Sequence, residues 1–420
     1  MVARGASRSA LIFILITVLI NVIGLGIILP VLPQLIGEVT GAGIAGAAVY
    51  GGWLMFVYGL MQFLFAPVMG SLSDQYGRRP ILLLSLLALG IDYLFMAVAP
   101  TIGLLFAGRL IAGIAGATVT TANAYIADVT PPEKRAQNFG LIGAAFGLGF
   151  VAGPVVGGIL GEIGTRIPFY AAAGLAFANL LFGFIVLPET LSAENRRPFS
   201  WARANTFTAL SRIRTFPLLA GLIGVIILYQ LAHDANPAAW AYFTMLKFGW
   251  SEQQVGYSLG AVGLAIAIVQ GGLIRVIIPR IGEVRAVCAG LISGAIGFAG
   301  FAFAPDGTLF YASILLFALI GLAMPAMRSL MSNAVPDSAQ GHLQGVITSV
   351  QSLTAIVSPL LMTQLFYLFS RPDAPVQFPG APFLAAALCL IVGLAVFLRA
   401  IPALIAGTAG QDGQSISSSG

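Results

Sequence analysis

An aspartate in the middle of an apolar segment is the side chain of this sequence with the clearest capacity for chemistry. Asp92 lies within residues 81–99, a run long enough to cross a bilayer. A carboxylate at that depth is costly unless it faces a partner or water, and such acids commonly relay protons. The simpler alternative is an aspartate that joins two helices through a hydrogen bond.

The next apolar segment contains a basic residue, Arg109, about two helical turns from its outer end. An unpaired guanidinium is expensive there, so we expect it to face protein or water. Asp92 and Arg109 are therefore our candidate proton-coupling residues, with Asp92 taking up a proton from outside and releasing it inward. The alternative is that Arg109 extends towards the membrane surface.

Polar residues also gather in the segment that spans 216–246, where Pro237 is expected to loosen the helix. They could bind cargo or titrate, or they could mark a helix end wetted by water outside the membrane. Their candidate substrate-binding residues are Gln230, His233, Asp234 and Trp240.

The composition excludes a water-soluble protein. Of 420 residues, 58% are hydrophobic and 8% are charged, whereas soluble domains contain about 25% charged residues. The net charge of +5 does not indicate nucleic-acid binding, because the basic residues lie in short loops between apolar segments. Both cysteines, Cys288 and Cys389, lie in apolar runs, and the sequence shows no metal-binding cluster. We expect no metal site and no cofactor.

The apolar segments predict an all-α membrane protein with 12 transmembrane helices in two pseudo-symmetric six-helix bundles. The predicted parts are an N-terminal bundle over 1–187, a cytoplasmic linker over 188–215, a C-terminal bundle over 216–403 and a disordered tail over 404–420. The expected spans are 10–36, 47–72, 80–99, 101–127, 136–160, 168–187, 216–246, 252–275, 284–304, 308–333, 341–369 and 381–402.

Charge asymmetry predicts the orientation. If the N-terminus is cytoplasmic, sixteen of the twenty Lys and Arg residues fall in inner segments and three in outer loops, while Arg109 is inside a span. This bias favours both termini in the cytoplasm, with the first span retained as an anchor.

The loop after the second span resembles the signature loop between helices 2 and 3 of the major facilitator superfamily, G-x-L-x-D-x-x-G-R-[RK]-P. Gly70 is expected to let helices approach, and Gly77 to permit a tight turn. Asp74 is expected to pair with an arginine. The alternative is an ordinary basic loop. The expected conformational latch comprises Gly70, Asp74, Gly77, Arg78, Arg79 and, at the end of span 4, Asp128.

Two further stretches narrow the resemblance. Gly149, Gly153, Pro154 and Gly157 in span 5 resemble the antiporter motif of the drug:proton branch of this superfamily, and an ordinary packing face is the alternative. Residues 21–33 are similar to the first helix of tetracycline-exporter-like transporters. There Asn21 replaces a common acid, and in span 8 Ile266 stands where those proteins often have histidine. The same resemblance adds Asn21 and, in the second helix, Gln62 to the candidate substrate-binding set.

The resemblance implies a proton-coupled antiporter that exports small amphipathic drugs by alternating access, with proton-coupled nutrient uptake as the alternative. It also implies a bacterial inner-membrane protein that acts as a monomer, whose partners are a small molecule, protons and the bilayer, and no nucleic acid. The cargo could arrive as a metal chelate. The sequence has no HExxH or Walker A motif, and its two histidines, His233 and His342, lie at different membrane depths, so we do not expect an enzyme.

Overall fold

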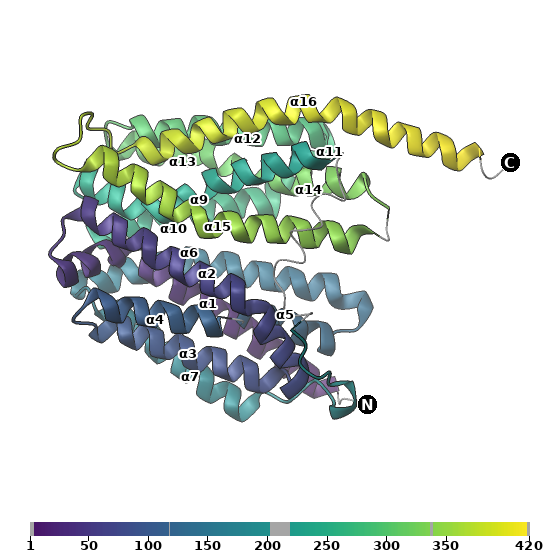
Figure 1. Cartoon of the computed structure of the whole chain (residues 1–420), viewed down its shortest axis with the longest axis horizontal. Helices are drawn as coiled ribbons and strands as arrows, with labels where there is room; N and C mark the ends of the chain where they lie inside the picture. The colour runs from purple at the N-terminus through teal and green to yellow at the C-terminus, as the bar shows by residue number, and fades with distance from the viewer. Residues whose placement is uncertain (1–3, 117, 202–218, 337–338, 418–420) are drawn as a thin grey trace. The chain divides into compact units, whose positions relative to one another are not determined.

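The computed structural model describes residues 4–116, 118–201, 219–336 and 339–417. These residues form helices joined by turns, loops and short 3₁₀ segments, and no β-strand occurs among them (Figure 1). Ten of the described helical segments are long and apolar enough to cross a membrane by length and composition. Every one of the twelve predicted spans coincides with helical residues, so the predicted all-α membrane fold is confirmed.

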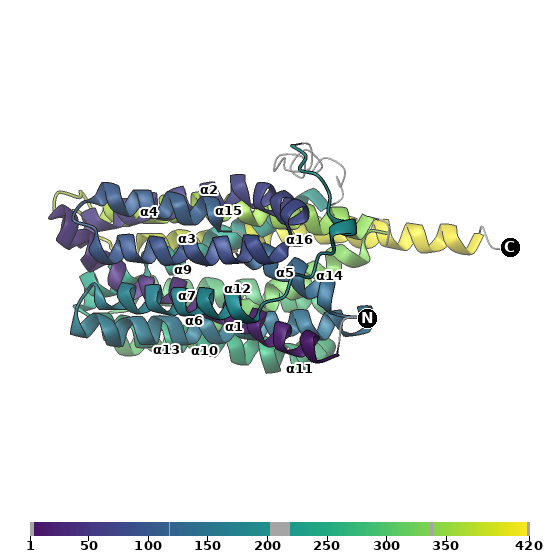
Figure 2. The ribbon, with the colours of Figure 1, turned by 90° about the horizontal axis from the view of Figure 1, so that it is seen from below.

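The chain divides into two compact units. The first contains Met1–Thr206 and Thr244–Gly263. In this unit α1 packs along α6, and α3 lies against both α4 and α7 (Figure 2). Its elements up to Thr206 are α1 (Arg4–Thr40), α2 (Ile44–Tyr76), α3 (Arg78–Val98), α4 (Ile102–Ala115), α5 (Thr118–Val129), η1 (Pro132–Lys134), α6 (Arg135–Ile163), α7 (Ile167–Val186) and η2 (Ala193–Asn195).

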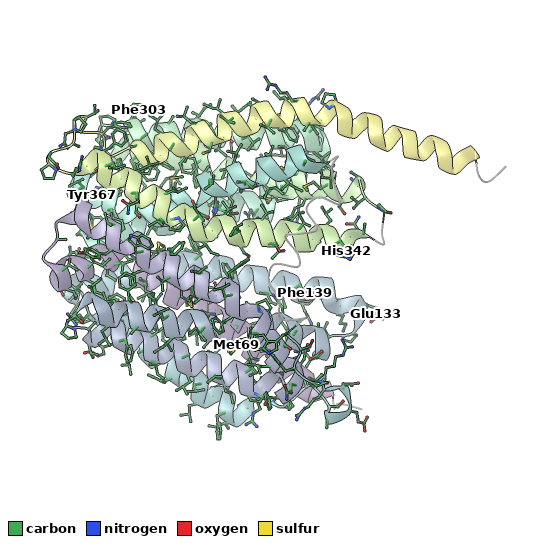
Figure 3. The ribbon with its side chains drawn as sticks, viewed as in Figure 1. Met69, Glu133, Phe139, Phe303, His342 and Tyr367 are labelled. Atoms are coloured by element: carbon green, nitrogen blue, oxygen red, sulfur yellow. The ribbon has the colours of Figure 1, made fainter. Side chains whose placement is uncertain are left out.

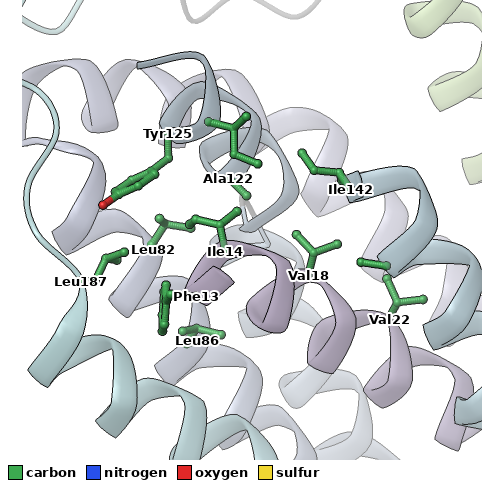
Figure 4. Packing of buried hydrophobic residues seen from close by; sticks show 12 residues of the cluster. Phe13, Ile14, Val18, Val22, Leu82, Leu86, Ala122, Tyr125, Ile142 and Leu187 are labelled. Atoms are coloured by element: carbon green, nitrogen blue, oxygen red, sulfur yellow. The ribbon is translucent and has the colours of Figure 1, made fainter. Parts of the chain in front are cut away.

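Apolar side chains from α1, α3, α5 and α6, with Leu187 at the end of α7, form the core at one end of this unit (Figure 4). The side chains of α1 recur every three to four residues, so one face of the helix meets α3, α5 and α6. The cluster consists of Phe13, Ile14, Val18, Val22, Leu82, Leu86, Ala122, Tyr125, Ile126, Ile142, Ala145 and Leu187. This core holds the N-terminal half of α3 in place, about two to three turns before Asp92.

The second unit contains Phe207–Phe243 and Leu264–Gly420. Within it α12 packs against α13, α14 and α16. Phe303 and Tyr367 lie at one end of the unit and His342 towards the other (Figure 3). The elements that fall wholly or partly in it are α9 (Ala220–Phe248), α10 (Glu252–Ile268), the π-helical η5 (Val269–Leu273), α11 (Ile274–Ile281), α12 (Glu283–Phe303), α13 (Gly307–Ala318), η6 (Leu319–Leu322), α14 (Ala323–Asn333), α15 (Gln340–Ser370) and α16 (Ala381–Ser417).

Two features differ from the organisation predicted from the sequence. The segment Thr244–Gly263 groups with the first unit, because small residues such as Gly256 and Gly260 let α10 approach Pro154 and Val155 of α6.

In addition, α16 continues to Ser417, where a disordered tail from residue 404 was expected. Extending an existing helix adds one hydrogen bond per residue without a new nucleus, so Ala403, Leu404 and the residues after them continue it.

Candidate functional site

Asp92 and Arg109 form a buried ion pair in the first unit. Arg109 Nε donates to Asp92 Oδ1 at 3.1 Å, and Arg109 Nη2 donates to Asp92 Oδ2. The Asp92 side chain is 0% exposed and that of Arg109 is 8% exposed. Arg109 therefore turns into the bundle, which decides against the alternative in which it extends to the membrane surface. A bidentate contact satisfies both charges, whereas either alone would be strongly destabilising at this depth.

Two neighbours of this pair were not recognised in the sequence. Met96, one turn after Asp92 on α3, places its Sδ 3.2 Å from Arg109 Nη2. The ring of Tyr58 on α2 lies 5.3 Å from the Arg109 guanidinium, within the range of a cation–π contact. The contact of Met96 with Arg109 can be recognised only once α3 and α4 are known to pack together, and that of Tyr58 only once α2 and α4 are.

Glycines on α4 create the space for this arrangement. A Cβ at position 108 would lie 2.8 Å from Asp92 Oδ1, so only glycine lets α4 approach the carboxylate. A Cβ at position 113 would lie 2.7 Å from the Tyr58 carbonyl oxygen of α2. The close approach of α4 to two helices thus depends on residues without side chains.

Gln62 has a structural role in this conformation. Its Nε2 donates to the carbonyl oxygen of Gly116 at 3.0 Å and lies 3.4 Å from Tyr58 Oη. It therefore ties α2 to the end of α4. Asn21, on α1 of the same unit, is 7% exposed. That these two residues bind substrate stays a prediction.

The predicted latch residues meet at the junction of α2 and α3. Arg78 Nη1 contacts Asp74 Oδ1 at 2.6 Å and Ser73 Oγ at 3.2 Å, and Arg78 Nε contacts Asp128 Oδ2 on α5 at 3.2 Å. Arg79 turns the other way and donates from Nη2 to the carbonyl oxygen of Phe184 at 2.6 Å. One arginine thus joins α2 to α5, and its neighbour joins α3 to α7.

The linker contributes a residue to this junction that the sequence analysis missed. Glu189 accepts hydrogen bonds from the backbone N–H groups of Arg78 at 2.9 Å and Arg79 at 3.2 Å, in the first turn of α3. Gly77 precedes that turn with φ 111°, and a Cβ there would lie 2.6 Å from the Glu189 carboxyl carbon. Glycine is needed at position 77 for both reasons.

One expectation for the latch is wrong. Gly70 was expected to allow close helix approach, but a Cβ at this position would meet nothing within 4 Å. The close approaches of α2 lie elsewhere along it, for example where Tyr58 and Met61 meet Gly113. The glycine at position 70 has no packing explanation in this structure.

The span 5 glycines form the seam between α6 and α1. A Cβ at Gly153 would lie 2.7 Å from the Ile23 carbonyl oxygen, and one at Gly157 would lie 2.7 Å from Ile27 Cα. Gly149 meets Val22 in the same way, and Pro154 packs against Gly26. This regular approach of two backbones fits the packing role expected of the motif.

In the second unit, Gln230, His233 and Asp234 lie together on α9. Gln230 Nε2 donates to Asp234 Oδ1 at 2.8 Å, and His233 Nδ1 lies 3.5 Å from the same oxygen. Trp240 does not join them. It is 1% exposed and packs in the core against Phe301, Phe310 and Phe383, because a large apolar ring gains most from burial among other rings. The prediction that Trp240 lines a substrate site is thus not met.

Among the described residues, no group of three or more His, Cys, Asp or Glu side chains could hold a metal ion. The helices long enough to cross a membrane, with an ion pair buried between them, define a multi-pass membrane protein.

The chain belongs to the Major Facilitator Superfamily, whose family model matches residues 14–359 and 235–416. It is 40% identical over 401 residues to the class C tetracycline resistance protein of Escherichia coli, covering 96% of this chain and 98% of that protein. It is 38% identical to the class E protein of the same organism, covering 84% and 86%. The predicted relationship to tetracycline-exporter-like transporters is thereby confirmed.

The fold also matches solved structures of the superfamily. A bacterial homologue of the human lysosomal transporter Spinster, in an inward-facing and unoccupied conformation, superposes with a TM-score of 0.78. The match covers 96% of this chain and 99% of that protein at 16% identity, so it supports the fold alone.

Proposed function

We propose that this protein exports small amphipathic drugs, tetracycline-like compounds among them, from the cytoplasm in exchange for protons. The similarity to tetracycline resistance proteins along nearly the whole chain supports the cargo class. The observation that carries the proton coupling is the buried contact of Asp92 with Arg109. We also propose a monomer in the bacterial inner membrane, with both termini cytoplasmic and no cofactor.

The chemistry of the pair follows from its contacts. A proton that reaches Asp92 cancels the negative charge that Arg109 compensates, so the guanidinium loses its counter-ion and must reorganise. Arg109 also contacts Met96 Sδ and the Tyr58 ring, so its movement would change the contacts that α4 makes with α2 and α3. Each proton moved down one pH unit supplies about 1.4 kcal/mol for this change.

The latch contacts lie next to the start of α3, so we propose that they switch together with the Asp92–Arg109 pair. Arg78 bridges Asp74 and Asp128, and Glu189 holds the start of α3, the same helix that bears Asp92. In the proposed cycle these contacts stabilise one conformation and are broken in the other. Alternating access requires two such discrete conformations.

Inverted membrane vesicles test the proposal. With an acidic interior, vesicles containing the protein should accumulate tetracycline against its gradient, and collapsing the pH difference should abolish the accumulation. Accumulation instead in right-side-out vesicles with an acidic exterior would contradict export and favour proton-coupled uptake.

A further inference from the structure

Two carboxylates of this chain lie deep in membrane segments. Of its fifteen acidic residues, Asp92 and Asp234 are the two that lie more than one turn inside a predicted span. Asp234 is fourteen residues from either end of α9 (Ala220–Phe248), which places it about 21 Å along the helix from each end. An acid at that depth needs an explanation in terms of a partner or a function.

The two acids differ in how their charge is met. Both oxygens of Asp92 accept from the Arg109 guanidinium. Asp234 contacts no Arg or Lys side chain among the described residues, and its nearest basic group is His233 at 3.5 Å. Its Oδ2 is buried and has no hydrogen-bond partner within the described chain. Asp92 is thus paired with a cation, whereas one oxygen of Asp234 is buried without a partner in the described part of this conformation.

A directed chain of hydrogen bonds ends at Asp234. Arg328 Nη2 on α14 donates to Gln351 Oε1 on α15 at 2.8 Å, and Gln351 Nε2 donates to Gln230 Oε1 at 3.5 Å. Gln230 Nε2 then donates to Asp234 Oδ1 at 2.8 Å. Every donor in this series of hydrogen bonds points towards the carboxylate, so each bond polarises the next. The positive charge of Arg328 thereby stabilises the Asp234 carboxylate through two intervening amide groups.

Aromatic rings flank the acceptor. The imidazole of His233 stacks on the ring of Tyr229 with centroids 6.1 Å apart, one turn along the same helix. The His233 side chain is 41% exposed, whereas that of Asp234 is 11% exposed. A carboxylate whose neighbour is a partly exposed ring, stacked on the buried Tyr229, suits an organic cation, which gains from the negative charge and from a ring face.

We propose that Asp234 Oδ2 binds the protonated amine of a cationic cargo molecule, with His233 and Tyr229 beside it and Gln230 holding the carboxylate in position. The inference rests on the proposed export function and adds a cargo class to it. A buried carboxylate oxygen without a partner is costly, so a cargo ammonium that arrives during the cycle would remove that cost. A single carboxylate, with no cluster of acids around it among the described residues, favours one positive charge over a metal ion.

A matched pair of compounds tests this inference. Tetracycline carries a dimethylamino group, and 4-dedimethylaminotetracycline lacks it. Binding of both compounds to the purified full-length protein in lipid nanodiscs should be measured for the wild type, Asp234→Asn, Asp234→Glu and the exposed-loop control Asp373→Asn. Asp234→Asn should raise the Kd for tetracycline at least about tenfold and that for the analogue less than about twofold.

Asp234→Glu should keep the preference for the amine, and Asp373→Asn should leave both Kd values unchanged. Unchanged binding of the analogue by Asp234→Asn shows that this variant is folded. Equal weakening of both compounds, or of neither, would overturn the inference, as would a wild type that does not prefer the amine. If the wild type prefers the amine in binding but does not transport tetracycline in vesicles, the proposed function is refuted and the proposed binding site is still supported.

Discussion

The carboxylate of Glu189 lies on the first turn of α3 and accepts a hydrogen bond from the backbone N–H of Arg78 at 2.9 Å. It also accepts from the backbone N–H groups of Thr190 and Leu191 in its own chain segment. A negative charge at a helix N-terminus is favoured by unpaired N–H groups and by the helix dipole. The linker thereby fastens the helix that carries Asp92.

Replacing this carboxylate should loosen the start of α3. Glu189→Gln keeps the size of the side chain but removes its charge, and we expect a loss of about 1 kcal/mol of stability. Thermal unfolding in detergent should show a lower Tm than for Glu194→Gln, a neutral replacement in the neighbouring exposed 3₁₀ turn. Equal Tm values for the two variants would contradict the role of Glu189.

The seam between α1 and α6 gives a second prediction. Gly157→Ala adds a Cβ only 2.7 Å from Ile27 Cα, whereas Gly147→Ala, on the same helix, adds one with nothing within 4 Å. Both changes alter helix propensity equally, so their difference isolates packing. We expect Gly157→Ala to cost about 1–3 kcal/mol and Gly147→Ala to be neutral or stabilising. Comparable melting of the two variants would show that the seam tolerates the extra atom.

The ionic latch gives a third prediction. The ion pair between Asp128 and Arg78 Nε is partly exposed. Asp128→Asn weakens this pair, so the free energy of unfolding should fall by less than about 1 kcal/mol. Transport should fall much more, because the balance between two conformations is sensitive to small free energies. Tetracycline transport and binding should be compared with those of Glu133→Gln. Wild-type transport by Asp128→Asn would remove Asp128 from the latch.

Local patterns in the sequence predicted the helices and most of the latch. Apolar length predicted the spans, and the resemblance to the superfamily's signature loop and to its fourth helix identified Asp74, Arg78 and Asp128. Asp92 and Arg109 were recognised individually because each is costly in an apolar segment.

Contacts between distant segments explain what the sequence could not predict. Glu189 meets Arg78 across 111 residues, and no local signal marks that pairing. The aromatic ring of Trp240 fits a binding site and a core equally well, and only the positions of Phe301 and Phe310 decide between them. The π-helical turn at Val269–Leu273 begins at Val269, which packs in a buried cluster with Ala318 and Leu322 from a later part of the chain.

The buried pair gives the fourth and most direct prediction. Asp92→Asn alone leaves the Arg109 charge buried without its counter-ion and should destabilise the protein by about 3–5 kcal/mol. The double variant Asp92→Asn with Arg109→Gln removes both charges, so it should fold with a Tm near that of the wild type. Proton release upon tetracycline addition should be measured in proteoliposomes with a pH-sensitive dye, for the wild type and the folded double variant. We predict proton movement coupled to tetracycline in the wild type and none in the double variant, and equal coupling in both would contradict the account.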